Sequence, residues 1–140
     1  MKMSRAERNN NPGNIKQNNQ LFKGEVRPSG DSVFKRFTDM TYGFRAIISV
    51  LKTYFYKWGL KTLAAIIRRW APETENKTAQ YLKFVCERTG LQPTDILKFS
   101  LSVFGAIILA IAHYESGYEK EEWQKNISDA WNEKFKGFLQ

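Results

Sequence analysis

The feature that most constrains the fold is an almost wholly apolar stretch, residues 99–112, which ends in the segment HYESG at residues 113–117. A helix of this composition is apolar on nearly every side, so it must lie in the centre of the molecule. It is too short to cross a bilayer, which takes about 20 apolar residues, and we expect no membrane anchor. The helix carries Glu115 to the edge of the core, where a carboxylate costs free energy unless it is paired, solvated or protonated.

The rest of the chain divides into a turn-rich part and a helical part. The segment NNNPGNIKQNNQ is typical of turns, and the runs LFKGEV and VFKRF on either side of RPSGDS predict a β hairpin within residues 20–38. Apolar residues then recur at helical spacing. Helices are expected over 41–59, 60–70, 76–90, 99–115 and 120–138.

These patterns predict a fold of the α+β class that is mainly α. The 140 residues suit one domain. Its expected parts are a turn-rich segment with a hairpin (1–40), a helical lobe (41–116) and a C-terminal helix (117–140).

The charge favours a polyanionic partner. Lys and Arg number 22 against 14 Asp and Glu, which gives a net charge of +8, and nucleic acid, an anionic bacterial envelope and acidic lipid all fit this charge. With one cysteine and one histidine, we expect no disulfide, no metal site and no cofactor. The first residues lack the apolar segment of a signal peptide, so synthesis in the bacterial cytoplasm is expected.

Several segments resemble lysozyme-like peptidoglycan hydrolases. AIAHYESG is similar to the helix end that carries the catalytic acid in this superfamily. In its glucosaminidase-type members, including flagellar peptidoglycan hydrolases, that segment is followed by a turn, a small hairpin and two helices. NNPGNIK (residues 10–16), LFKGEV and VFKRFTDMTYGFRAIISVLKTY resemble this later part, and RWAPETENKTAQYLKFVCERTGL resembles a segment that faces the groove. Because they precede Glu115 here, the resemblance implies a circularly permuted lysozyme-like fold.

A second resemblance covers roughly residues 8–115. The pattern RNNNPGN, GFRA and RWAP is similar to short proteins of bacteriophages and prophages that share an NNPGN motif and are often labelled virion or structural proteins. It implies action in the periplasm or cell wall after delivery by a phage particle, by lysis or by a secretion machinery.

The lysozyme-like resemblance implies a catalytic role for Glu115. As a general acid it must stay protonated near neutral pH, and burial together with the negative end of the helix dipole raises the pKa of such a carboxyl. Most glycosidases use a second carboxylate. Glu25 is preferred for it, with Asp31 and Asp39 as alternatives, whereas lytic transglycosylases of the superfamily work with one Glu.

The same resemblance implies a glycan groove. Its substrate-binding residues would be Asn11, Asn14, Trp70, Asn76, Tyr81 and His113. Each also has a plain structural interpretation: asparagines beside Pro-Gly form turns, aromatic residues at helical spacing fill cores, and a single histidine packs or supports its neighbours.

The predicted function is therefore that of a peptidoglycan-degrading glycosidase. It would be a muramidase, a glucosaminidase or a lytic transglycosylase that acts on peptidoglycan glycan strands in an anionic envelope. The alternative is a noncatalytic phage structural protein, or an envelope- or nucleic-acid-binding protein, on the same fold. Nucleic acid is less favoured because the basic residues are scattered, and a lysozyme-like fold that keeps only glycan binding is a third possibility.

Overall fold

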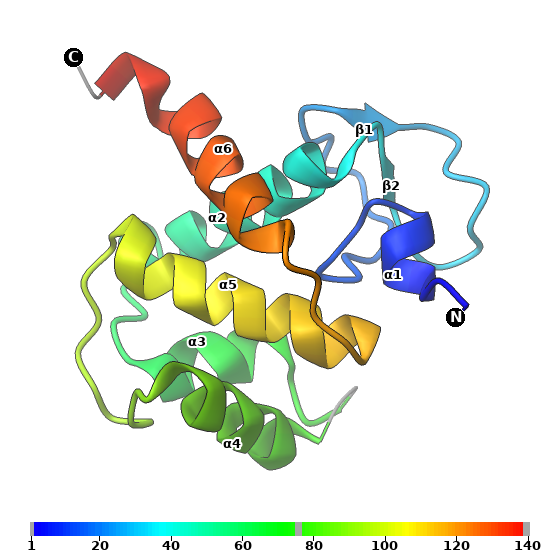
Figure 1. Cartoon of the computed structure of the whole chain (residues 1–140). Coiled ribbons are helices and arrows are strands. Elements are labelled where there is room, and N and C mark those ends of the chain that lie inside the picture. The colour runs from blue at the N-terminus through cyan, green and yellow to red at the C-terminus, as the bar shows by residue number, and fades with distance from the viewer. Residues whose placement is uncertain (1, 75–76, 139–140) are drawn as a thin grey trace.

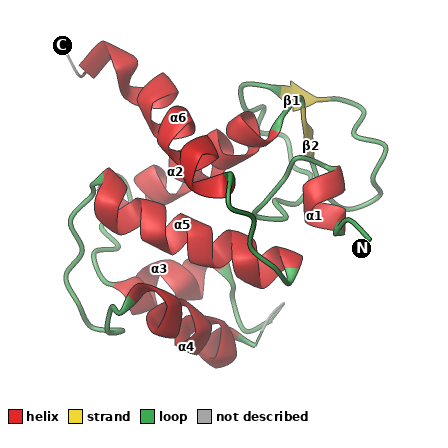
Figure 2. Ribbon diagram, in the orientation of Figure 1, coloured by secondary structure: helices red, strands yellow, loops and turns green. Residues whose placement is uncertain are grey.

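The computed structural model describes residues 2–74 and 77–138, and it is mainly helical (Figure 1). A two-stranded antiparallel sheet is the one sheet among these residues (Figure 2), so the predicted α+β class with dominant helices is confirmed. The elements are α1 (Arg5–Arg8), β1 (Glu25–Val26), β2 (Arg36–Phe37), α2 (Met40–Tyr56), α3 (Leu63–Trp70), α4 (Thr78–Thr89), α5 (Leu101–Ser116), α6 (Trp123–Phe135) and the 3-10 turn η1 (Lys136–Phe138).

Helix α5 lies at the centre, as its apolar sequence predicts. Figure 1 shows α2 and α6 on one side of it and α3 and α4 on the other. The Ser100 hydroxyl accepts a hydrogen bond from the Val103 amide and caps the helix start, and Gly117 ends the helix with a φ of 82°. Four large side chains of this helix have no exposed surface: Phe104, Ile107, Ile108 and Ile111.

The surrounding helices follow the predicted patterns with shifted ends. Asp39 caps α2, Thr62 caps α3, and Gly90 ends α4 with a φ of 77°. Helix α2 ends at Tyr56 rather than at residue 59, and half of the surface of Trp58, beyond that end, is exposed. The helix expected over 120–138 starts at residue 123 and continues into η1.

The hairpin lies where it was expected but is very short. Glu25 pairs with Phe37 and Val26 pairs with Arg36, and a bridge between Lys16 and Phe34 extends the contact. The short helix α1 was not predicted. It is tied to the link between α5 and α6, because the Tyr118 hydroxyl accepts a hydrogen bond from the Ser4 amide and donates one to Glu7.

The turn at residues 9–14 joins the hairpin to α2 and α5. The Asn11 side chain is fully buried and donates to the backbone oxygens of Ile15 and Lys35, while its own oxygen accepts from the Ile15 amide. Asn10 and Asn14 have positive φ values of 50° and 48°, a conformation that asparagine tolerates better than most residues. No helix among the described residues is long and apolar enough to span a membrane.

This turn depends on a glycine in α2. A Cβ atom at Gly43 would lie 2.0 Å from the Asn10 backbone oxygen and 2.6 Å from Cδ of Pro12. Neither neighbour is a flexible side-chain end, so a larger residue must displace the whole turn. Residues 9–14 also place Asn14 beside α5, so a change at Gly43 should disturb the groove described below.

We therefore predict that Gly43→Ala destabilises the protein by about 2 kcal/mol, the scale of overpacking a tight contact. Gly105→Ala in α5 is the matched control, because its Cβ would meet the flexible end of Leu101 at 3.3 Å. The control should change the free energy of unfolding by less than about 1 kcal/mol, since alanine also favours the helix. Denaturant unfolding followed by circular dichroism measures both, and equal stability of the two variants would contradict the role of Gly43.

Candidate functional site

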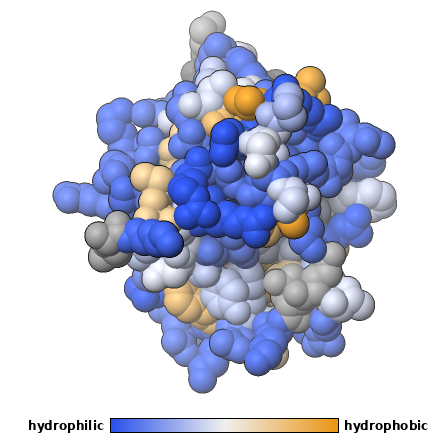
Figure 3. All heavy atoms as spheres, turned by 90° about the vertical axis from the view of Figure 1, so that its right-hand side faces the viewer, coloured by the Kyte–Doolittle hydropathy of each residue, from blue (hydrophilic) through white to orange (hydrophobic). Residues whose placement is uncertain are grey.

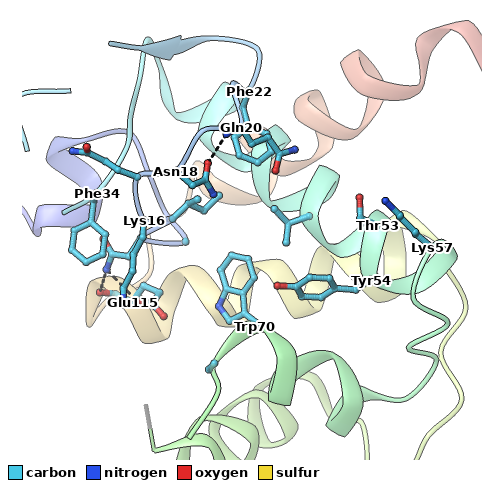
Figure 4. Close-up of a pocket in the computed structure, with 16 residues that line it drawn as sticks. Lys16, Asn18, Gln20, Phe22, Phe34, Thr53, Tyr54, Lys57, Trp70 and Glu115 are labelled. Atoms are coloured by element: carbon cyan, nitrogen blue, oxygen red, sulfur yellow. Dashed lines mark hydrogen bonds between the residues drawn. The ribbon is translucent and has the colours of Figure 1, made fainter. Parts of the chain in front are cut away.

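An open groove of about 930 Å³ lies between the N-terminal segment and helices α2, α3 and α5. Figure 4 shows Trp70 and Tyr54 on one side of it and Asn18, Gln20 and Phe22 on the other. The face of the molecule seen in Figure 3 is mostly hydrophilic, with small separate apolar patches. The groove wall itself combines polar side chains with aromatic rings.

Glu115 lies in the groove wall, on the last turn of α5, and is held by a chain of hydrogen bonds. The Tyr81 hydroxyl donates to its Oε2 atom at 2.7 Å, and the Asn14 side-chain amide donates to Oε1 at 3.1 Å. The Trp70 indole N–H donates to the Tyr81 hydroxyl at 3.1 Å. The carboxyl group is thus fixed by residues from the N-terminal turn, α3 and α4.

Burial raises the pKa of Glu115, although the hydrogen bonds from Tyr81 and Asn14 partly offset it. The Tyr81 pKa is raised well above its usual value, first by burial and then by the adjacent Glu115 charge. The Oδ1 atom of Asn14 is buried and has no hydrogen-bond partner among the described residues. Rotation of the Asn14 amide would turn this oxygen toward Glu115.

The remaining groove wall combines aromatic rings with amide and ammonium groups. The Arg69 guanidinium lies 5.6 Å from the Tyr54 ring, and burial raises the Tyr54 pKa despite this positive charge. Rings of this kind offer flat apolar surface, while amide side chains both donate and accept hydrogen bonds. The other wall residues that contribute rings or polar groups are Lys16, Gln17, Asn18, Gln20, Phe22, Phe34, Thr53 and Lys57.

The structure brings together four of the predicted site residues. Glu115, Asn14 and Trp70 line the groove, and Tyr81 lies behind them as the hydrogen-bond partner of Glu115 and Trp70. Asn11 is instead a buried scaffold of the turn.

His113 points elsewhere and does not line the groove. Its ring packs against Phe84, and its nitrogens lie 3.5 Å from Arg88 and 3.7 Å from Glu119. Asn76 lies outside the described residues.

The expected second carboxylate is not in the groove. Glu25 accepts hydrogen bonds from the fully buried Lys35 at 3.0 Å and from Arg27 at 2.7 Å. Burial raises the pKa of Glu25, but the hydrogen bonds from Arg27, the Phe22 amide and Lys35 outweigh this effect and lower the pKa overall. Asp31 binds Arg5 at 2.6 Å, which lowers the Asp31 pKa strongly. Asp39 caps α2. All three carboxylates stabilise the scaffold, and Glu115 is the one acidic residue among the described residues that line the groove.

The sequence did not identify Tyr54, Lys57 and the amides of residues 17–20 as site residues. Tyr54 shares the helical apolar pattern of α2, which predicts packing, and only its position at the end of the buried face exposes its ring edge to the groove. The amide residues belong to a turn-rich segment with no periodic pattern. Among the described residues, no cluster of His, Cys, Asp and Glu could hold a metal ion.

We predict that Glu115→Gln is more stable than the parent at neutral pH. A raised pKa means that folding favours the protonated carboxyl. As the pH rises above 4.5, the ordinary pKa of a glutamate, the carboxyl ionises in the unfolded chain before it does so in the folded protein. The parent therefore loses stability until Glu115 is ionised in the folded protein as well. Glutamine has no such ionisation, and rotation of Asn14 can pair its unpaired oxygen with the new amide.

The stability difference should therefore grow with pH and shrink toward zero below pH 4.5. Glu87→Gln, which changes an exposed residue of α4, should show no such trend. Thermal unfolding at a series of pH values measures both variants. A difference that falls as the pH rises would contradict a raised pKa of Glu115 in the folded protein.

Comparison with known proteins links the chain to a bacteriophage. Protein P5 of Pseudoalteromonas phage PM2 is 38% identical over 130 residues, an alignment that covers 89% of this chain and 80% of the phage protein. No family model matches the chain. The relative confirms the predicted association with phages. It contradicts the predicted function as a peptidoglycan-degrading glycosidase, because the match spans most of the chain and leads to a phage protein whose name carries no enzymatic activity.

The correction favours the noncatalytic alternative and agrees with the scaffold role of Glu25. The hydrogen-bonded carboxyl of Glu115 then needs an explanation other than proton transfer to a glycosidic bond. At this level of identity over most of both chains, the sequences share a common origin. The chain belongs to the family of Protein P5 of Pseudoalteromonas phage PM2.

Proposed function

We propose that this chain is a noncatalytic phage protein that binds a glycan of the bacterial envelope in the groove beside Glu115. The observation that carries the proposal is the composition of the groove wall. Aromatic rings of Tyr54 and Trp70 lie opposite the amide side chains of Asn18 and Gln20. A sugar ring presents apolar C–H faces and a rim of hydroxyl groups, and such a wall matches both.

The shape of the site also suits an extended polymer. The groove is open to solvent and, at about 930 Å³, is at the upper end of the range for small-molecule pockets, about 300–1,000 Å³. It lies on the surface between separate elements rather than inside the core. A glycan strand could lie along it without either strand end having to enter a closed cavity.

Glu115 has a binding role in this proposal. Each oxygen of the Glu115 carboxyl accepts one hydrogen bond, from Tyr81 or from Asn14, and keeps a second lone pair that can accept a bond from a sugar hydroxyl. Tyr81 and Asn14 hold this carboxyl in place, and Trp70 in turn binds the Tyr81 hydroxyl, so little conformational freedom is lost on binding.

The proposal includes a lysozyme-like fold in circularly permuted order. Its support is the position of Glu115 at the end of a central helix, facing a turn and a hairpin that precede it in the chain. The place of action would be the periplasm or cell wall after delivery by a phage particle. The net charge of +8 would favour the encounter with an anionic envelope.

The test is binding to purified sacculi and to soluble N-acetylglucosamine oligomers, with Tyr54→Ala and Gln20→Ala as groove variants. Tyr56→Ala is the matched control, because Tyr56 belongs to the same helix but does not line the groove. We expect Tyr54→Ala to weaken binding about tenfold, the scale of truncating one aromatic contact. Gln20→Ala, at an exposed position, should weaken it less and leave stability unchanged.

The parent should also release no soluble sugar fragments from sacculi on prolonged incubation. Fragment release would contradict the noncatalytic assignment. Loss of binding in Tyr56→Ala equal to that in Tyr54→Ala would remove the groove from the proposal. Failure to bind sacculi and oligomers, with tight binding to a single-stranded oligonucleotide, would favour a nucleic-acid partner instead.

A further inference from the structure

A second depression, of about 420 Å³, adjoins the groove on the side of α2 and α6. Five of the residues that line it are cationic, and none is acidic. We call it the basic pocket and define it by these five residues: Lys23, Arg45, Lys52, Lys57 and Lys134. It shares Lys57 with the groove, whereas Lys52 and Lys134 line the basic pocket and not the groove.

The cations of the basic pocket converge on a small volume. The Nζ atoms of Lys52 and Lys134 lie 6.0 Å and 5.9 Å from the centre of the same Phe135 ring. Lys23 binds Glu133 at 2.5 Å, and Arg45 pairs with the same carboxylate through its Nε atom. One carboxylate is thus shared by two of the five cations, and Lys136 lies 3.9 Å from it as well.

The positive charge exceeds what nearby acidic residues can neutralise. None of the ion pairs among residues 2–74 and 77–138 involves Lys52, Lys57 or Lys134. Burial lowers the pKa of Lys134, and the adjacent charges of Arg45 and Lys52 lower it further. Three positive groups therefore repel one another at a partly buried position, and an anion between them would relieve the repulsion.

The rim of the basic pocket is apolar and exposed. Leu21 is 68% exposed and Tyr56 is 60% exposed, and both line the pocket edge. Next to a cluster of lysines they form the pairing of basic and apolar groups that anionic lipid surfaces attract.

We propose that the basic pocket is a binding site for phosphate groups, separate from the glycan groove. Phosphate fits because several oxygens can accept hydrogen bonds at once from ammonium groups and from the planar donor set of Arg45. The bond to Glu133 uses the Nε donor of Arg45, one of its five N–H groups. The phosphate could belong to a lipid headgroup or to a small phosphorylated molecule, and the exposed rim favours the lipid.

The experiment compares the parent with Lys52→Gln/Lys134→Gln. Lys98→Gln is the charge control, because Lys98 is exposed and lines neither depression. In the first arm, inorganic phosphate should raise the melting temperature of the parent and of Lys98→Gln above its value in chloride at equal ionic strength, because a ligand of the folded state stabilises it. The double variant should lose this difference.

The second arm identifies the source of the phosphate. The parent should float with vesicles that contain phosphatidylglycerol and not with vesicles of phosphatidylcholine alone. Each lysine near an anionic surface contributes about a fivefold gain in affinity, so the double variant should bind roughly 30-fold more weakly. Leu21→Asn should weaken vesicle binding and leave the phosphate effect unchanged. Phosphate stabilisation without vesicle binding would support the site with a small phosphorylated ligand.

Two results would overturn the proposal. In the first, the double variant and Lys98→Gln respond equally to phosphate and to vesicles. The lysines of the basic pocket would then act only through the overall positive charge of the protein and not as a specific site. In the second, neither phosphate nor vesicles bind, while a single-stranded oligonucleotide binds through the same lysines. Sugar binding in the groove is measured separately, so either result leaves the glycan proposal standing.

Discussion

The packing of the apolar helix α5 at the centre of the other helices is the constraint on which the rest of the structure depends. An all-round apolar helix must be covered by other elements, and α2, α3, α4 and α6 provide that cover. One side of the helix stays partly uncovered, at Ser102 and Ala106. The packing of the rest of the helix fixes the position and direction of its C-terminal turn, which carries Glu115 to the groove wall.

The hydrogen bonds around Glu115 convert this packing into a site. A carboxyl group at the edge of a core is unfavourable in its charged form, and the bonds from Tyr81 and Asn14 offset part of that cost. The same bonds hold three elements together at the groove wall. The sequence alone suggests that this environment tunes Glu115 as a catalytic acid. The match to a phage protein favours a role of the same carboxyl in binding. Fixed polar groups serve recognition as well as catalysis, because both require that the groups be ordered in advance.

The sequence predicted those parts of the molecule that depend on periodic apolar patterns. The central helix, the helices around it and the approximate hairpin follow from the spacing of apolar residues, whereas the capping roles of Asp39 and Ser100 are findings of the structure. The Glu115, Asn14 and Trp70 positions were predicted by resemblance, and the structure brings them together. The short α1 and the roles of residues 16–22 could not be predicted, because their conformation is set by contacts with distant parts of the chain. Glu25 shows the same limit: its sequence position suggested the groove, whereas its bond to the buried Lys35 directs it into the scaffold.

The bond between Asn14 and Glu115 has a consequence for how the protein is made. It joins residues 101 positions apart, and the short helix α1 is likewise tied to Tyr118, 114 positions after Ser4. During synthesis the ribosome releases the N-terminal turn long before α5 exists, so the early segment has no partner to pack against. Contacts of such long sequence separation also form late in folding, since a large loop must close first. A growing chain that stops before α5 therefore carries the groove residues between positions 13 and 71, but it has neither Glu115 nor the central helix against which the two walls pack.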